Sequence, residues 1–216
     1  MRQRKAKDLE NRLKECAHLM IAEPSPEAQA EYFPSEGDVF VEIGCGKGDF
    51  IIKKAKDNPG ANFVAIEGQE TVILRAMEKV LQLEAEGEKL PNLKFMNTFV
   101  EDARELFEKD SVAGIYLNFS DPWPKARHAK RRLTHRNRLA NYALVAKPGA
   151  ALEFKTDNED LYEFTLEEIH ESGYSILEET RDLHASSYDS RFTMTEYEKK
   201  FSGLGKNINY VKVALK

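Results

Sequence analysis

The chain has 216 residues, of which 41% are hydrophobic and 32% are charged, and its formal net charge is −5. This length and balance predict a single folded domain and exclude a disordered chain. The longest apolar stretch near the N-terminus covers residues 17–22, far short of the ~20 residues of a membrane helix. The basic start lacks the apolar core of a signal peptide, so we expect a cytoplasmic protein that is not bound to a membrane.

Short apolar runs alternate with longer amphipathic ones along the chain. The pattern predicts strands over residues 38–43, 62–67, 93–100, 112–119 and 150–156. It predicts helices over residues 49–57, 69–86, 103–107, 133–146 and 157–172. Two last strands, over residues 174–179 and 209–215, flank a polar and irregular stretch. Strands that alternate with helices indicate an α/β fold with a mostly parallel, seven-stranded sheet, and the last two strands indicate an antiparallel edge hairpin.

The first strand runs into a glycine-rich turn, Gly44-Cys-Gly46-Lys-Gly48, that opens a helix. Glycines there let the backbone approach a ligand closely. The spacing departs from the G-x-G-x-x-G of dinucleotide-binding proteins, and Glu42 before the turn suits a cationic ligand better than a pyrophosphate. Glu67, which ends the second strand, can accept hydrogen bonds from a ribose diol. Together these features resemble the S-adenosylmethionine site of class I methyltransferases.

Two acidic residues, Glu101 and Asp102, follow the third strand. In class I methyltransferases an acidic residue at this place often lies near the adenine amino group. We favour Asp102 for that contact, with Glu101 as the alternative. Asp102 can equally serve as the N-cap of the next helix, and the two roles can coexist.

The segment after the fourth strand combines a rigid loop with a cluster of cations. The loop, Asn118-Phe-Ser-Asp121-Pro-Trp123-Pro, lies where the transferred methyl group should be. Trp123 can stack on a base or pack in the core, and Asp121 can act at the site or as a turn residue. Residues 122–138 hold seven lysines and arginines and no acid, which favours phosphate binding over a merely solvated face.

These residues carry a resemblance to a known family. Residues 118–133 resemble the signature of bacterial tRNA (guanine-N7-)-methyltransferases, the TrmB family. Residues 154–158 and 194–201 match two further family motifs in order, as does the Met1-Arg-Gln-Arg start. The resemblance implies a class I, Rossmann-like fold, S-adenosylmethionine as the methyl donor and tRNA as the partner. It implies that the product is 7-methylguanosine in the tRNA variable loop.

The resemblance and the motifs together assign the expected site residues. We expect the cofactor to contact Glu42, Gly44, Gly46, Gly48, Glu67, Glu101, Asp102 and Asp121. We expect the substrate to contact Lys125, Arg127, His128, Lys130, Arg131, Arg132, Asp157, Thr195, Glu196, Tyr197 and Glu198. Asp121 and Asp157 are the expected catalytic residues. Ala126 departs from the family, which often has a second lysine there.

The domain organisation follows from the same assignments. We expect residues 1–36 to form a basic N-terminal segment and a helix, and residues 37–216 to form the methyltransferase domain. Residues 180–207 are expected to be an inserted recognition loop. No CxxC pair or acidic cluster accompanies the two histidines of the basic run, so we predict no metal site.

The chemistry of guanine N7 limits what the protein must do. N7 carries a lone pair and no proton, so no base has to act first, and alignment and exclusion of water can supply catalysis. Asp157 and Glu198 are candidates to accept hydrogen bonds from guanine N1–H and the 2-amino group. Helix capping is the alternative role for Asp157.

Two other functions stay open at this point. The Asp-Pro-Trp-Pro loop resembles the D-P-P-W loop of enzymes that methylate adenine N6. A non-catalytic RNA-binding module on the same scaffold is the other alternative, although such a module would be expected to lose the glycines or Glu67. The sequence leaves open whether the protein is a monomer or a homodimer.

Overall fold

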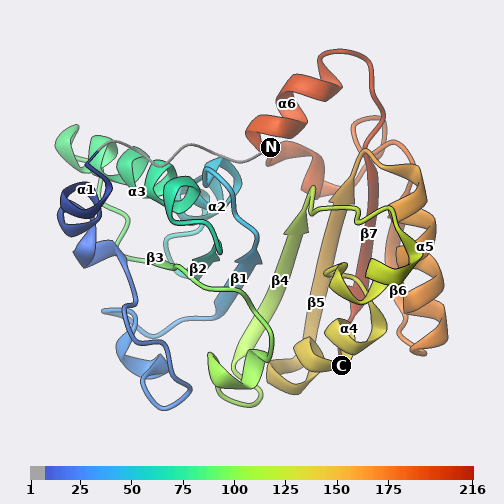
Figure 1. Ribbon diagram of the computed structural model, residues 1–216, viewed down its shortest axis with the longest axis horizontal. Coiled ribbons are helices and arrows are strands. Elements are labelled where there is room, and N and C mark those ends of the chain that lie inside the picture. Colours follow the sequence, from blue (N-terminus) through green and yellow to red (C-terminus); the bar gives the residue numbers. More distant parts are fainter. Residues whose placement is uncertain (1–7) are drawn as a thin grey trace.

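A seven-stranded sheet runs through the computed structural model, which describes residues 8–216 (Figure 1). Its strands are β1 (Val39–Ile43), β2 (Asn62–Ile66), β3 (Leu93–Met96), β4 (Val112–Asn118), β5 (Ala146–Thr156), β6 (Ile176–Thr180) and β7 (Asn209–Ala214). They lie in the order β3-β2-β1-β4-β5-β7-β6. The first five pair in parallel, and β7 pairs antiparallel with both β5 and β6. The predicted α/β fold, with an antiparallel C-terminal edge, is therefore confirmed.

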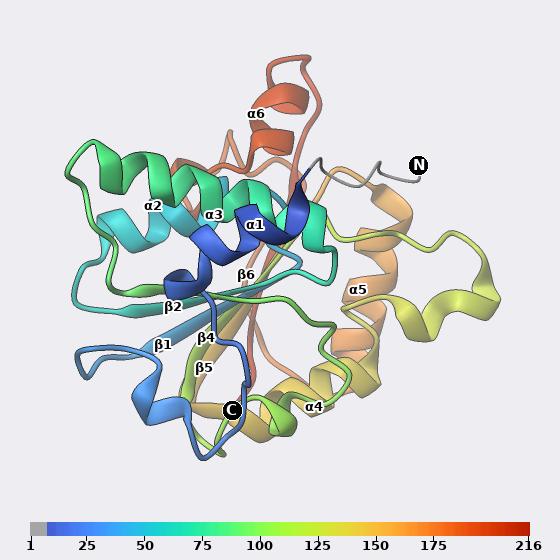
Figure 2. The same cartoon turned by 60° about the vertical axis from the view of Figure 1, so that its left-hand side comes forward.

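Helices cover both faces of this sheet (Figure 2). They are α1 (Leu9–Glu15), α2 (Asp49–Asp57), α3 (Glu70–Ala85), α4 (Arg136–Val145), α5 (Glu159–Glu171) and α6 (Glu196–Ser202). One apolar core joins α2 and α3 to the sheet, and a second joins α4 and α5 to the opposite face. The strand β2 is buried at every position, as expected for a parallel strand that is covered on both sides.

The N-terminal part packs onto the core rather than standing apart. Cys16 and Leu19, just after α1, are buried against α2 and α3, and Met20 forms a bridge with Phe95 of β3. The predicted helix of this part is present as α1. The basic start, residues 1–7, lies outside the described residues.

Several elements differ from the expected ones. The helix expected over residues 103–107 is a short 3₁₀ turn, Ala103–Glu105, and α4 begins at Arg136 rather than at residue 133. β3 ends at Met96 because Asn97 turns away and donates its side-chain amide to the Glu67 carbonyl, 2.8 Å away. β5 begins at Ala146 rather than at residue 150, with a register shift where it pairs with β4. The stretch 180–207, expected to be irregular, contains α6, whose N-terminus is closed by a capping box between Thr195 and Glu198.

Candidate active site

The glycine-rich turn lies at the carboxyl end of β1. Gly44, Gly46 and Gly48 all have φ between +56° and +80°, a region that favours glycine. A Cβ at Gly44 or Gly46 would meet no heavy atom within 4 Å, so the backbone here is open to a ligand. The turn is held by the amides of Gly44 and Cys45, which both donate to the Ile66 carbonyl of β2 at 2.8 and 3.0 Å.

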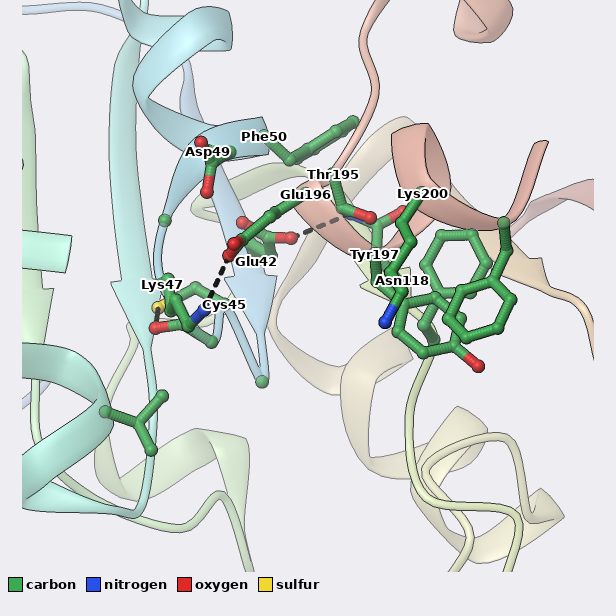
Figure 3. Close-up of a pocket in the computed structure, with 16 residues that line it drawn as sticks. Glu42, Cys45, Lys47, Asp49, Phe50, Asn118, Thr195, Glu196, Tyr197 and Lys200 are labelled. Carbon is green, nitrogen blue, oxygen red and sulfur yellow. Dashed lines mark hydrogen bonds and ion pairs between the residues drawn. The ribbon is translucent and has the colours of Figure 1, made fainter. Parts of the chain in front are cut away.

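Two cavities flank this turn and share Gly44, Gly46 and Phe119. The larger, which we name the α6 cavity, has a volume of about 610 Å³ and lies between the turn, the start of α2 and α6 (Figure 3). The smaller, the Glu67 cavity, has a volume of about 400 Å³ and lies between the turn, the ends of β2 and β3, and the loop after β4. Their positions at the carboxyl edge of the parallel strands are those expected for a ligand site.

Glu42 forms part of the wall of the α6 cavity and is only 1% exposed. Its Oε1 accepts a hydrogen bond from the Asn118 side chain at 2.8 Å, whereas its Oε2 is buried without a partner. Burial raises the pKa of this carboxyl group to about 8, although the Asn118 amide opposes the shift. A buried carboxylate oxygen that has no partner and lies beside a cavity can accept a hydrogen bond from a cationic ligand bound in that cavity.

Glu67 lies in the Glu67 cavity and is half-buried. Its two carboxylate oxygens accept hydrogen bonds from the backbone amides of Gly46, at 3.2 Å, and Gln69, at 3.0 Å. These contacts orient the carboxylate between the glycine-rich turn and the start of α3. Each oxygen keeps a second lone pair, which fits the expected contact with a ribose diol.

The two acids after β3 have other surroundings. Asp102 accepts a hydrogen bond from the Arg104 amide at 2.9 Å and caps a short 3₁₀ turn. Its carboxylate also accepts from the Arg104 guanidinium and from Asn141, and these donors hold its pKa well below the usual range. The capping interpretation is thus confirmed. Neither Asp102 nor the exposed Glu101 lines either cavity, so the contact with adenine stays a prediction.

The loop after β4 brings Asp121 and Trp123 into the lining of the Glu67 cavity. Asp121 is exposed, and Trp123 is half-buried rather than in the core. Phe119 and Trp123 have φ of +51° and +42°, an uncommon backbone for residues that are not glycine and one that often marks functional loops. Arg132 holds the loop in place by donating to the Pro122 and Trp123 carbonyls at 2.9 and 3.1 Å.

The cations of this region fall into two groups. Four of them are exposed and form no ion pair with any other residue in the described part of the chain: Lys125, Arg127, Lys130 and Arg131. Arg136 instead pairs with Glu168 at 2.8 Å, and Arg138 donates to the Val100 and Glu101 carbonyls. His128 is half-buried and lies edge-on to Trp123. The structural roles of Arg132, Arg136 and Arg138 were not visible in the sequence.

Asp157 follows β5 and contacts the segment that carries α6. Its Oδ2 accepts hydrogen bonds from the Tyr197 hydroxyl at 3.2 Å and the Lys206 ammonium at 2.9 Å. The N-cap of α5 is Asn158, which accepts from the Leu161 amide, so the capping interpretation of Asp157 is wrong. Asp157 therefore joins the end of β5 to the segment expected to recognise the substrate.

The N-cap and first turn of α6 form the outer wall of the α6 cavity, which Thr195, Glu196 and Tyr197 line. Their contact with the substrate stays a prediction. Glu196 forms an ion pair of 2.8 Å with Lys47 of the glycine-rich turn, across the cavity (Figure 3). The Tyr197 ring packs against Phe119, with ring centroids 5.0 Å apart. These contacts connect α6 with both the glycine-rich turn and the end of β4.

Glu198 does not lie where we expected it. It is completely buried, lines neither cavity and faces into the protein. Its carboxylate pairs with Lys155 at 3.4 Å and accepts from the Thr195 amide, because it completes the capping box of α6. The expected guanine contact is therefore replaced by a structural role, which the T-x-x-E spacing of residues 195–198 could have indicated.

Lys155, at the end of β5, has a structural role that its position in the sequence did not indicate, since a contact with phosphate or the target was the expected one. It is 1% exposed, and its ammonium donates to the Ser190 and Thr193 carbonyls at 2.7 and 2.8 Å. With Glu198, these contacts fix the segment before α6 to the end of β5. Burial lowers the pKa of Lys155, and the neighbouring Glu198 carboxylate opposes that shift.

Other classes of site find no support in the described residues. Residues 8–216 contain no group of three or more histidine, cysteine or acidic side chains that could hold a metal ion. Within the same range, no helix is long and apolar enough to cross a membrane.

Solved structures of methyltransferases share this fold at low sequence identity. A 16S rRNA methyltransferase, KamB, matches with a TM-score of 0.66 and 16% identity, covering 89% of this chain and 94% of its own. An antibiotic-related methyltransferase matches with a TM-score of 0.62 and 20% identity, covering 87% and 92%. A SAM-dependent methyltransferase from Aquifex aeolicus matches with a TM-score of 0.57 and 16% identity, covering 98% and 100%. These likenesses confirm the class I fold.

A comparison with protein-family models identifies the family of this chain, which the shared fold alone does not do. The family model Methyltransf_4, described as "Putative methyltransferase", matches residues 36–211, which include both cavities and the loop after β4. The chain therefore belongs to this family of S-adenosylmethionine-dependent methyltransferases, the family of the tRNA (guanine-N7-)-methyltransferase TrmB, as the sequence resemblance predicted.

Proposed function

We propose that this protein transfers the methyl group of S-adenosylmethionine to N7 of a guanosine in the variable loop of tRNA. The observation that carries the proposal is that residues 118–133 contain both residues of the Glu67 cavity wall and exposed cations. Within this one segment, Asp121 and Arg131 line the Glu67 cavity, and three further exposed cations that form no ion pair within residues 8–216 follow Asp121: Lys125, Arg127 and Lys130. A cofactor cavity and a phosphate-binding surface are thereby joined, as an RNA-modifying enzyme requires.

The residues present fit the cofactor. The unpaired Oε2 of Glu42 suits the ammonium group of its methionine part, and the open backbone at Gly44 and Gly46 admits close approach. Glu67 suits the ribose, and Asp121 lines the same cavity. Asp102 or Glu101 is proposed for the adenine amino group. When bound, the cofactor supplies an electrophilic methyl group on a sulfonium.

The protein's own task is to orient the target base and to exclude water. Guanine N7 attacks through its lone pair, so no side chain has to remove a proton first. Phe119, Tyr197 and Phe201 form a run of aromatic rings on the wall of the α6 cavity, against which a base can lie. These rings and the first turn of α6 would shield the reacting atoms from solvent.

We assign guanine recognition to Asp157, which lines neither cavity itself but contacts the α6 cavity wall through its hydrogen bond from Tyr197. Both of its hydrogen bonds, from Tyr197 and Lys206, fall on Oδ2. Its Oδ1 is then the oxygen that would accept from guanine N1–H or the 2-amino group, which adenine cannot reproduce. The same carboxylate would stabilise the positive charge that methylation places on the purine.

The tRNA backbone is proposed to lie on the four unpaired cations. Lys125, Arg127, Lys130 and Arg131 follow directly after the rigid loop, so phosphates bound there lie close to the Glu67 cavity. His128, beside Trp123, and Arg132, which holds the loop, would act with them. Counter-ion release from such contacts makes the affinity depend on salt.

The test is to incubate the protein with S-adenosylmethionine and unmodified tRNA, digest the RNA and identify the methylated nucleoside by mass spectrometry. We expect 7-methylguanosine. N6-methyladenosine, or no product from a protein that binds S-adenosylhomocysteine, would overturn the proposal. Asp157→Asn should lower the rate at least about 100-fold with cofactor affinity unchanged. Asp160→Asn, at an exposed aspartate in the first turn of α5, is the matched control.

A further inference from the structure

The wall of the Glu67 cavity includes an aromatic side chain that is largely exposed. Phe99 lies in its lining and is 72% exposed, more than any other large apolar side chain in the described range. Phenylalanine normally buries most of its ring because exposing it to water is unfavourable. An exposed ring in the wall of a cofactor cavity is therefore a surface for a ligand.

The ring of Phe99 rests directly on the backbone of Gly68. A Cβ built at Gly68 would overlap three atoms of that ring. Gly68 differs in this respect from Gly44 and Gly46, because its φ is not in the left-handed region and any residue could adopt its backbone conformation. Glycine at position 68 is therefore needed because the Phe99 ring lies against its backbone, and not because the backbone takes a conformation that only glycine favours.

Hydrogen bonds between the two strand ends hold the chain that leads to Phe99 close to Glu67. The Glu67 amide donates to the Met96 carbonyl at 3.1 Å, and the Asn97 side chain donates to the Glu67 carbonyl at 2.8 Å. Phe99 follows Asn97 by two residues, and Gly68 follows Glu67 by one. The ring and the Glu67 carboxylate therefore line the same cavity in a defined relation.

We propose that Phe99 is the platform on which the adenine ring of the cofactor stacks, and that Gly68 provides the space for that platform. A ribose held by Glu67 brings its attached base to the neighbouring wall, where Phe99 lies. Stacking uses the π faces of the two rings and needs no polar partner. Glu101 and Asp102 lie outside the lining of this cavity, so stacking on Phe99 is a contact separate from the polar one proposed for the adenine amino group.

Calorimetric titration of the full-length protein with S-adenosylhomocysteine tests this role. Phe99→Ala should weaken binding about 5- to 100-fold, the range found when an aromatic platform under a base is removed. Phe99→Trp should retain the affinity, and Phe99→Leu should lie between Phe99→Ala and the unchanged protein. Phe192→Ala is the matched control, because Phe192 is also exposed, at 62%, but lies outside both cavities.

Two further measurements separate stacking from general damage. The unfolding temperature of ligand-free Phe99→Ala should equal that of the unchanged protein, since the side chain is exposed. Gly68→Ala should weaken binding by displacing the ring, and the double variant should bind no more weakly than Phe99→Ala. Additive losses would overturn the pairing of ring and glycine. An affinity of Phe99→Ala within twofold of the unchanged protein, or equal affinities of the Leu and Phe proteins, would overturn the stacking.

Discussion

Two glutamates are buried at the carboxyl edge of the sheet, and their surroundings differ. Glu198, at the start of α6, is 0% exposed, and its carboxylate pairs with Lys155 and accepts from the Thr195 amide. Glu42, at the end of β1, is 1% exposed, and only one of its oxygens has a partner, Asn118.

We interpret Glu198 as a carboxylate with a structural role and Glu42 as one that binds a ligand. Burial raises the pKa of both groups, so burial alone does not separate them. What separates them is whether each carboxylate oxygen has a hydrogen-bond or ion-pair partner within the protein. At Glu198 the protein supplies the compensating charge itself, whereas at Glu42 one oxygen has no partner, and we propose that a ligand in the α6 cavity supplies it.

The largest expected effect concerns stability. Glu198→Gln leaves the Lys155 ammonium buried without its counter-charge, so we expect the free energy of unfolding to fall by about 3 kcal/mol in urea denaturation. Glu196→Gln, an exposed position on the same helix, should change it by less than about 0.5 kcal/mol. A loss below 1 kcal/mol for Glu198→Gln would show that the ion pair does not hold α6 in place.

Glu42→Gln should affect ligand binding rather than stability. Without cofactor, we expect this variant to be at least as stable as the unchanged protein, because an amide costs less to bury than an incompletely paired carboxyl group. Its affinity for S-adenosylhomocysteine should fall by about 10- to 100-fold, the effect of losing a hydrogen bond to a charged group. Titration calorimetry measures this loss, and an unchanged affinity would remove Glu42 from the cofactor site.

The raised pKa of Glu42 predicts a pH dependence with a definite sign. Because the folded protein retains this proton up to about pH 8, whereas the unfolded chain loses it near 4.5, the Glu42 contribution makes stability decline as pH rises through that range. A cationic ligand prefers the ionised form, so binding at pH 7 should release a proton, and the affinity should rise by up to about tenfold per pH unit.

Calorimetry in two buffers with different ionisation enthalpies detects that proton. In Glu42→Gln the proton release should disappear. Equal proton release in both proteins would assign the titration to another group.

The smallest effects are expected at single exposed cations. If four to six phosphates are neutralised, log K for tRNA should fall with log salt at a slope of roughly −3 to −5. Arg127→Ala should reduce that slope by about 1 and leave stability unchanged. Arg136→Ala, which breaks the contact with the buried Glu168, should lower stability instead. A slope that does not depend on Arg127 would place the RNA on another surface.

The sequence predicted the sheet, the glycine-rich turn and the loop after β4 because each depends on local pattern. It did not separate Glu42 from Glu198, since their partners, Asn118 and Lys155, are distant along the chain and are brought together only by folding. The basic run shows the same limit. Arg136 looks like its neighbours in the sequence, and only the approach of Glu168 from α5 gives it a structural role.

The helix α6 was missed for a different reason. The spacing of Thr195 and Glu198 is the local signature of a helix start, but family resemblance assigned both residues to the substrate. The structure divides them: Thr195 lines the α6 cavity, and Glu198 faces the interior. The same four-residue motif therefore supplies both a residue of the cavity wall, Thr195, and the capping box that begins α6.

The strand order has a consequence for the order of assembly. Within the described sheet β6 is an edge strand that pairs with β7, and β7 enters between β6 and β5 from a later part of the chain. The parallel strands β1 to β5 can therefore associate, and form the glycine-rich turn and Glu67, before the segment with α6 is closed at both ends. A folding intermediate of this kind would contain Glu67 and the four exposed cations but would lack the α6 wall with Tyr197, so binding of the methyl donor should return earlier during refolding than methyl transfer.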